Sequence, residues 1–117
     1  MIGSVYLVKH TTAVLATHTI EHPEDIQQDP SFKQCFATRE GNGGTSHRDA
    51  FDKIESYLAD KDPSQFVYIS FGDNYSDVES LIHKYPLIQS TDTIWLTTSD
   101  GRVMNPNIVG GRTIVLP

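Results

Sequence analysis

Short apolar runs near the start of the chain are typical of β-structure. Residues 5–8 and 13–15 are apolar and rich in branched side chains, and polar residues separate them. The many Val and Thr residues over 4–21 disfavour a helix, so the pattern predicts two strands that form a hairpin. Residues 22–31 carry prolines and acids and predict a loop, and residues 32–39 favour a further edge strand.

The middle of the chain changes to helical spacing after a glycine-rich turn. Three glycines fall within residues 41–44 and permit backbone conformations that are closed to other residues. Thr45 or Ser46 is placed to cap a helix that begins there and ends near Asp60. The apolar residues expected along one side of this helix are Ala50, Phe51, Ile54, Tyr57 and Leu58.

The second half of the chain predicts strands that alternate with a helix. Residues 66–71 indicate a buried strand, and residues 93–98 and 112–116 indicate two more. Residues 76–79 show the capping-box pattern, so we expect a helix that stops before Tyr85 and its following proline. Between the strands at 93–98 and 112–116, turn and loop residues predict no regular element. The alternation favours a mainly parallel sheet with helices packed on it.

Composition and charge narrow the class of protein. The 117 residues include 9 basic and 15 acidic residues, a net charge of −6, which argues against nucleic-acid binding. The single Cys35 excludes an intrachain disulfide and a CxxC metal site. No apolar run approaches the roughly 20 residues of a membrane helix. We therefore expect one α/β domain over residues 1–117, in a soluble cytoplasmic protein.

Two loops are expected to meet at one edge of the sheet, because parallel strands of an open α/β sheet present their carboxyl ends on the same side. One loop covers residues 41–46, and the other covers residues 71–77. They offer the carboxylates of Asp73 and Asp77, which are oxygen ligands that suit Mg²⁺. Hydroxyl groups of the same kind come from Thr45, Ser46 and Ser70. The alternative to a metal site is a purely structural role for these residues. In that case the glycines form a turn, Thr45 caps the helix, and the two carboxylates are solvated in a loop.

Segments on both sides of this edge resemble a known family. Gly43–Phe51 and Val67–Asp73 are similar to the second half of a von Willebrand factor A-like (VWA-like) domain of the bacterial and phage type. The strand at 93–98 with its Trp, and the closing Gly-Arg-x-Ile strand at 111–116, resemble the last strands of that family. The resemblance implies a three-layer α/β fold with a mainly parallel sheet, here without the family's usual first strand.

The resemblance also implies a metal-ion-dependent adhesion site. In the family this site uses an Asp-x-Ser-x-Ser on the first strand, a Thr in the second loop and an Asp in the third. Thr45 matches the second element, Phe71 occupies the position of the third, and Asp73 follows two residues later. Because the chain contains no Asp-x-Ser-x-Ser, the resemblance implies a degenerate site, with Thr45 and Asp73 as metal ligands and Mg²⁺ bound weakly or not at all.

Three functions fit these residues. The first is a non-enzymatic protein–protein interaction module. Its binding residues are Gly43, Gly44, Thr45, Ser46, His47, Asp73 and Asp77. The alternative is a small divalent-metal-dependent hydrolase or nuclease that uses Asp73, Asp77 and Asp100. The third is a phosphate site at the glycine-rich loop, although no Lys-Ser/Thr of a P-loop follows the glycines. The lack of a nucleophile–base pair in the motifs favours the first.

The remaining candidate residues have a structural and a chemical interpretation. We expect His47 and Arg48 to be solvated at the helix start rather than bound to an anion. A zinc site at His18 and His22 is disfavoured, because a spacing of four does not put them on one face outside a helix. It also needs a further ligand, either Cys35 or His47. We expect that cysteine to be a small buried hydrophobe rather than a nucleophile.

The first strand offers a mode of assembly. Edge strands template pairing with another chain, and residues 5–8 are apolar. We therefore expect this strand to contact a partner strand, most simply in a homodimer with twofold symmetry.

Overall fold

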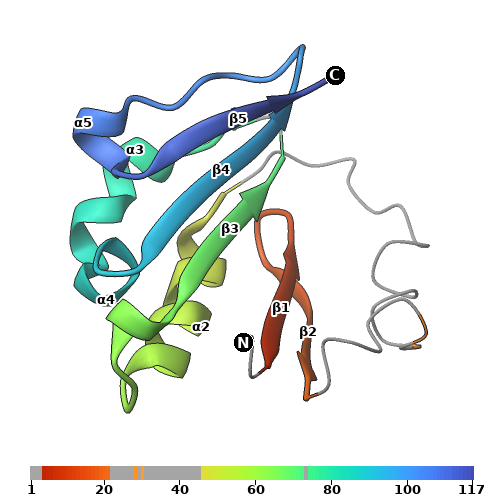
Figure 1. The fold of residues 1–117 in the computed structure, drawn as a ribbon, viewed down its shortest axis with the longest axis vertical. Helices are drawn as coiled ribbons and strands as arrows, with labels where there is room; N and C mark the ends of the chain where they lie inside the picture. Colours follow the sequence, from red (N-terminus) through yellow and green to blue (C-terminus); the bar gives the residue numbers. More distant parts are fainter. Residues whose placement is uncertain (1–3, 22–27, 29, 31–45, 73) are drawn as a thin grey trace.

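A computed structural model describes residues 4–21, 28, 30, 46–72 and 74–117 (Figure 1). The strands are β1 (Val5–His10), β2 (Val14–Ile20), β3 (Val67–Phe71), β4 (Asp92–Thr98) and β5 (Arg112–Leu116). The helices are α2 (Arg48–Leu58), α3 (Val78–Leu81), α4 (Pro86–Gln89) and α5 (Pro106–Val109), with 3-10 turns η2 (Pro63–Gln65) and η3 (Ile82–Lys84). The edge strand predicted over 32–39 lies outside the described residues.

The five strands form two sheets. β1 and β2 pair antiparallel, with Tyr6 opposite Thr19, which confirms the predicted hairpin. The other strands pair parallel in the order β3-β4-β5, with Ile69 opposite Ile94. The α/β class with a parallel sheet is therefore confirmed.

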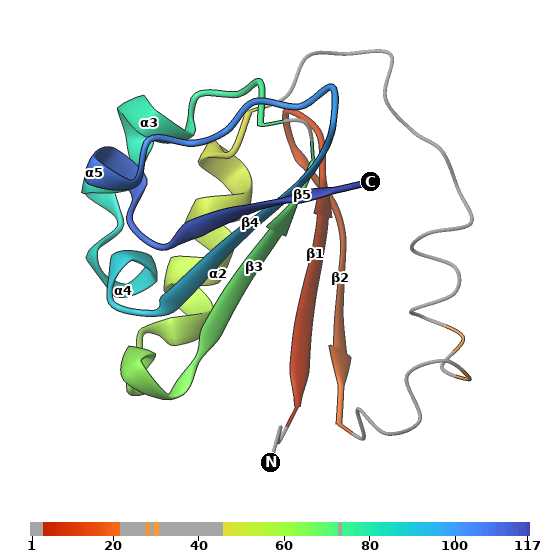
Figure 2. The same cartoon turned by 45° about the horizontal axis from the view of Figure 1, so that its top comes forward.

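Helices α2 to α5 pack on one face of the three-stranded sheet (Figures 1 and 2). Tyr68 of β3 and Trp95 of β4 point into this helical layer, where their rings lie 5.6 Å apart. Val67 and Ile69 of β3 point to the other face and are more than half exposed, so the prediction of a buried strand over 66–71 is wrong for this face. Among the described residues no helix covers that face, so the third layer of a VWA-like domain stays a prediction.

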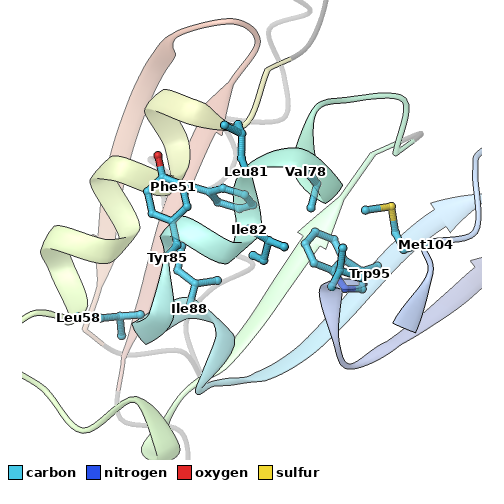
Figure 3. Close-up of a cluster of buried hydrophobic side chains, with 10 residues drawn as sticks. Phe51, Leu58, Val78, Leu81, Ile82, Tyr85, Ile88, Trp95 and Met104 are labelled. Carbon is cyan, nitrogen blue, oxygen red and sulfur yellow. The ribbon is translucent and has the colours of Figure 1, made fainter. Parts of the chain in front are cut away.

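The core lies between α2, α4 and β4. Phe51, Ile88 and Trp95 are fully buried, and Figure 3 shows them in one apolar cluster with Tyr85. The Phe51 ring lies 5.1 Å from the Tyr85 ring and 6.2 Å from the Tyr68 ring. The predicted apolar side of α2 is confirmed, because its members are buried or partly buried in this cluster or beside it.

The region after β3 holds more helix than the sequence predicted. α3 is only four residues long and continues as η3, and α4 begins at Pro86, where the sequence predicted only a stop. Proline suits the first helical position because its missing N–H has no partner there in any case. The predicted loop before β5 contains α5, whose start is capped by the Asn105 side chain through the backbone N–H of Asn107 at 3.0 Å.

Candidate functional site

Asp77 joins the two loops that were predicted to meet. Its Oδ2 accepts a hydrogen bond from Ser46 Oγ at 2.6 Å, and its Oδ1 accepts one from the His47 backbone N–H at 2.8 Å. Ser76 Oγ also donates to Oδ1, at 3.1 Å. Partial burial raises the pKa of Asp77, but the hydrogen bonds from these residues outweigh it and hold the pKa below its ordinary value. The carboxylate is therefore ionised and bound within the protein.

The structure brings together the predicted site residues that it describes. Ser46, His47 and Asp77 are in direct contact. The other predicted binding residues lie outside the described residues: Gly43, Gly44, Thr45 and Asp73. The capping-box prediction for residues 76–79 is wrong, because Asp77 rather than Ser76 is the N-cap residue of α3 and no side chain caps this helix. The Asp77 carboxylate binds the start of α2 instead.

His47 is buried, with only 5% of its surface exposed. The prediction of a solvated His47 is therefore wrong, because its ring packs 5.2 Å from Phe51 and 4.7 Å from His10. Burial first, and then the neighbouring His10, lower the pKa of His47 to about 4, although Asp77 opposes the shift. The ring is thus neutral at neutral pH. Arg48 is exposed, as expected.

Ser76 links the His47 ring to Asp77. The Nδ1 atom of His47 lies 2.7 Å from Ser76 Oγ, which also lies 3.1 Å from Asp77 Oδ1. Asp77, Ser76 and His47 therefore form a chain of hydrogen bonds that orients the ring.

His10, which was not predicted as a site residue, closes the cluster from the hairpin. Its Nδ1 lies 3.2 Å from the backbone oxygen of Ser46 and 3.1 Å from that of Thr11. The Ser46 backbone N–H in turn donates to Thr11 O at 3.1 Å. The end of β1 is thus tied to the start of α2. No local signal marks His10, because its partner Ser46 lies 36 residues away in the sequence.

Asn74 shapes the loop that follows β3. Its backbone has φ 65°, in the left-handed region that Asn tolerates better than most residues. The buried side-chain amide donates to the backbone oxygen of Arg102 at 2.8 Å. The loop also carries Tyr75, which is 61% exposed, and begins at Phe71, which is 64% exposed. Two aromatic side chains near the carboxyl end of β3 are therefore exposed to the solvent.

The described carboxylates do not converge on a shared site. Asp77 binds the start of α2, whereas Asp100 accepts a hydrogen bond from Thr98 Oγ1 at the end of β4. Within the described part of the chain, no group of three or more His, Cys, Asp and Glu side chains is placed to hold a metal ion. Of the zinc ligands considered, His18 lies in β2, and His22 and Cys35 lie outside the described residues.

No protein-family model, curated protein or solved structure matches this chain. The resemblance to VWA-like domains therefore depends on the sequence motifs alone and stays a prediction. Among the helices of the described residues, none is long and apolar enough to cross a membrane.

Proposed function

We propose that this chain is a non-enzymatic protein–protein interaction module whose partner binds at the carboxyl end of β3. The observation that supports it is the pair of exposed aromatic residues, Phe71 and Tyr75, next to the cluster of Ser46, His47 and Asp77. Aromatic side chains are enriched in protein interfaces and supply much of their binding energy. Catalysis by this cluster is disfavoured, since His47 is buried and Asp77 is occupied by internal donors.

In this proposal the chain is a VWA-like domain, with the family's third layer and a degenerate metal site. The order of a hairpin, a helix and three parallel strands supports it, together with the motifs around Thr45 and Asp73. Direct contact with the partner replaces contact through Mg²⁺, because Asp77 already accepts hydrogen bonds from Ser46 and His47. The net charge of −6 favours a protein partner over nucleic acid, and the single cysteine suits the cytoplasm.

Affinity capture from the native host, with Mg²⁺ and with EDTA, identifies the partner. Its binding to purified variants then tests the proposal. Phe71→Ser and Tyr75→Ser should each weaken binding by about tenfold or more. Val67→Ser is the matched control, because Val67 is exposed at the opposite end of the same strand, and it should change binding by less than about twofold. Equal binding by all variants, or binding that requires Mg²⁺, would show that the proposal is wrong.

A further inference from the structure

We infer that the outer face of the three-stranded sheet is an interface between two copies of this chain. The outer face is the side of β3, β4 and β5 that carries no helix in the described part of the chain (Figures 1 and 2). The two copies meet face to face about a twofold axis. In this arrangement Asp92 of each copy pairs with Arg112 of the other.

The outer face is apolar although it is open to solvent. Residues opposite each other in the register share one face, so the exposed Ile69 and Phe71 of β3 place their partners in β4 and β5 on the same side. Phe71, Leu96 and Ile114 form one row that crosses all three strands. Parallel sheets are almost always covered on both faces, so this face is expected to have a partner. Its apolar members include Val67, Ile69, Phe71, Ile94, Leu96 and Ile114.

One acid and one base also lie on the outer face. Asp92 begins β4 opposite Val67, and Arg112 begins β5 opposite Ile94, so both side chains are on this side of the sheet. Both residues are exposed, and neither side chain forms an ion pair or a hydrogen bond within the described part of the chain. The outer face is therefore neutral in a chain whose net charge is −6.

These two charges favour a second copy as the partner. A basic partner would pair with Asp92 but repel Arg112, and an acidic partner would do the reverse. In a twofold interface, a residue that meets a second residue of the other copy is met by it in return. A twofold axis midway between Asp92 and Arg112 therefore forms the same ion pair twice and leaves neither charge unpaired.

The register places this axis over apolar residues. Strands lie about 4.8 Å apart and residues rise about 3.3 Å along a strand, so Arg112 lies about 4.8 Å across the sheet and about 6.6 Å further along it than Asp92. The line that bisects this pair at right angles runs within about 2 Å of Ile94 and Ile69. Each of these isoleucines thus meets its own copy, with the ion pairs beside them. The strands of the two sheets cross steeply, as in orthogonal sheet packing.

The size of the outer face sets the expected strength of the dimer. β3, β4 and β5 have 5, 7 and 5 residues, so the face measures roughly 14 Å by 20 Å. Standard interfaces bury about 800 Å² on each partner, and smaller ones are weak and transient. We therefore expect a reversible dimer with a dissociation constant of roughly 10–300 µM.

Analytical ultracentrifugation of the full chain, at concentrations up to about 1 mM, measures this dimer. Asp92→Arg and Arg112→Asp each bring like charges together in both ion pairs, so each should weaken self-association at least tenfold. The double variant exchanges the two charges and should dimerise within about threefold of the unaltered chain. Lys53→Glu is the matched control for net charge, because it makes the same change as Arg112→Asp at an exposed position of α2. It should change the dissociation constant by less than about twofold.

A mixture of the two single variants gives the sharpest test. Asp92→Arg leaves two bases on the outer face and Arg112→Asp leaves two acids, so a heterodimer of the two restores both ion pairs. The equimolar mixture should associate at least tenfold more tightly than either variant alone.

The apolar centre of the interface is tested separately. Ile69→Ser should weaken the dimer by about tenfold. Ile108→Ser should change it by less than about twofold, because Ile108 is exposed on α5 in the helical layer. Circular dichroism confirms that each variant is folded, and the charge variants decide the test if Ile69→Ser is not.

Three results would overturn the inference. An unaltered chain that stays monomeric up to about 1 mM would mean that the outer face has a different partner. A dimer that Asp92→Arg and Ile69→Ser leave intact would mean that another surface, such as the edge of β1, joins the copies. A mixture that associates no more tightly than its components would remove the twofold pairing. None of these results bears on the loop site proposed above, because every variant keeps Phe71 and Tyr75 and no other protein is present.

Discussion

The Asp77 carboxylate, at the start of α3, accepts a hydrogen bond from the His47 backbone N–H at the start of α2, 30 residues earlier in the chain, at 2.8 Å. The N–H groups of a first helical turn have no partner within the helix. Asp77 therefore supplies to α2 the acceptor that a local cap residue usually provides. It also adds a negative charge at the positive end of the helix dipole.

Replacement of Asp77 by Asn should destabilise the fold. The Asn side chain keeps one acceptor oxygen but loses the negative charge and the second acceptor oxygen. In the native protein, the two carboxylate oxygens accept separate hydrogen bonds, and Oδ2 accepts the one from Ser46 Oγ at 2.6 Å. A hydrogen bond to a charged group contributes about 1.5–3 kcal/mol, so we expect Asp77→Asn to lower the free energy of unfolding by about 2 kcal/mol. Urea denaturation measures it. Asp92→Asn, at an exposed site, should change it by less than about 0.5 kcal/mol, and equal losses in both variants would contradict the prediction.

The positions of the main elements were predictable because they depend on local patterns. The apolar spacing of Ala50, Phe51 and Leu58 predicts α2, since residues three and four apart share one side of a helix. The branched and aromatic run at 66–71 predicts β3 in the same way. The short helices α4 and α5 were missed because four residues are too few for a periodic pattern, and each of them is set by a proline at its first position.

The candidate site was only partly predictable. The approach of Asp77 to Ser46 was predictable from the topology, since residues that follow parallel strands are expected at the same edge of the sheet. The burial of His47 and its contact with His10 did not follow, because they depend on how the hairpin packs against α2. Residue type and spacing in the sequence carry no information on that packing.

The stability of the fold should depend on pH through His47. The unfolded chain binds a proton at this residue near the ordinary pKa of 6.5, whereas the folded protein resists protonation until about pH 4. The unfolded state therefore binds more protons between these values, and the free energy of unfolding falls as the pH falls. The contribution is complete above pH 6.5 and is lost at about pH 4, a change of about 3 kcal/mol. Asp77 acts below this window, since its pKa is lowered from 3.8.

Urea denaturation at several values between pH 7.5 and 4.5 measures this effect. His47→Gln places a neutral amide at the same position and removes the titrating group. The variant should lose most of the slope of stability against pH over this range, whatever its stability at pH 7.5. An unchanged slope would assign the pH dependence to other groups.

Glu55 of α2 should stabilise the start of α4. Its Oε1 accepts a hydrogen bond from Leu87 N–H at 2.8 Å, and its Oε2 accepts one from Ile88 N–H at 3.1 Å. This is a helix cap supplied by another helix, and loss of a cap typically costs about 1 kcal/mol. We expect Glu55→Ala to lower the free energy of unfolding by about 1–2 kcal/mol and Glu55→Gln, which keeps one acceptor, by less.

The neighbouring residue gives the control for Glu55. Ser56 is exposed on the same helix, so Ser56→Ala should change the stability by less than about 0.5 kcal/mol. Thermal unfolding of Glu55→Ala, Glu55→Gln and Ser56→Ala at one pH tests the prediction. A Glu55→Ala protein as stable as Ser56→Ala would show that the carboxylate does not cap α4.

Gly111 should not tolerate a side chain. Its φ of 65° lies in the left-handed region, and a Cβ atom at this position would collide with the backbone carbonyl of Thr93 in β4. The close approach lies at the point where β5 begins to pair with β4, so neither backbone moves without disturbing the ladder. Strain and overpacking each cost about 1–3 kcal/mol, and we expect Gly111→Ala to lower the free energy of unfolding by about 3 kcal/mol.

Gly72→Ala is the matched control, because a Cβ there meets nothing within 4 Å. It should change the stability by less than about 0.5 kcal/mol in the same urea experiment. Equal unfolding midpoints for the two variants would mean that β5 begins without this close contact.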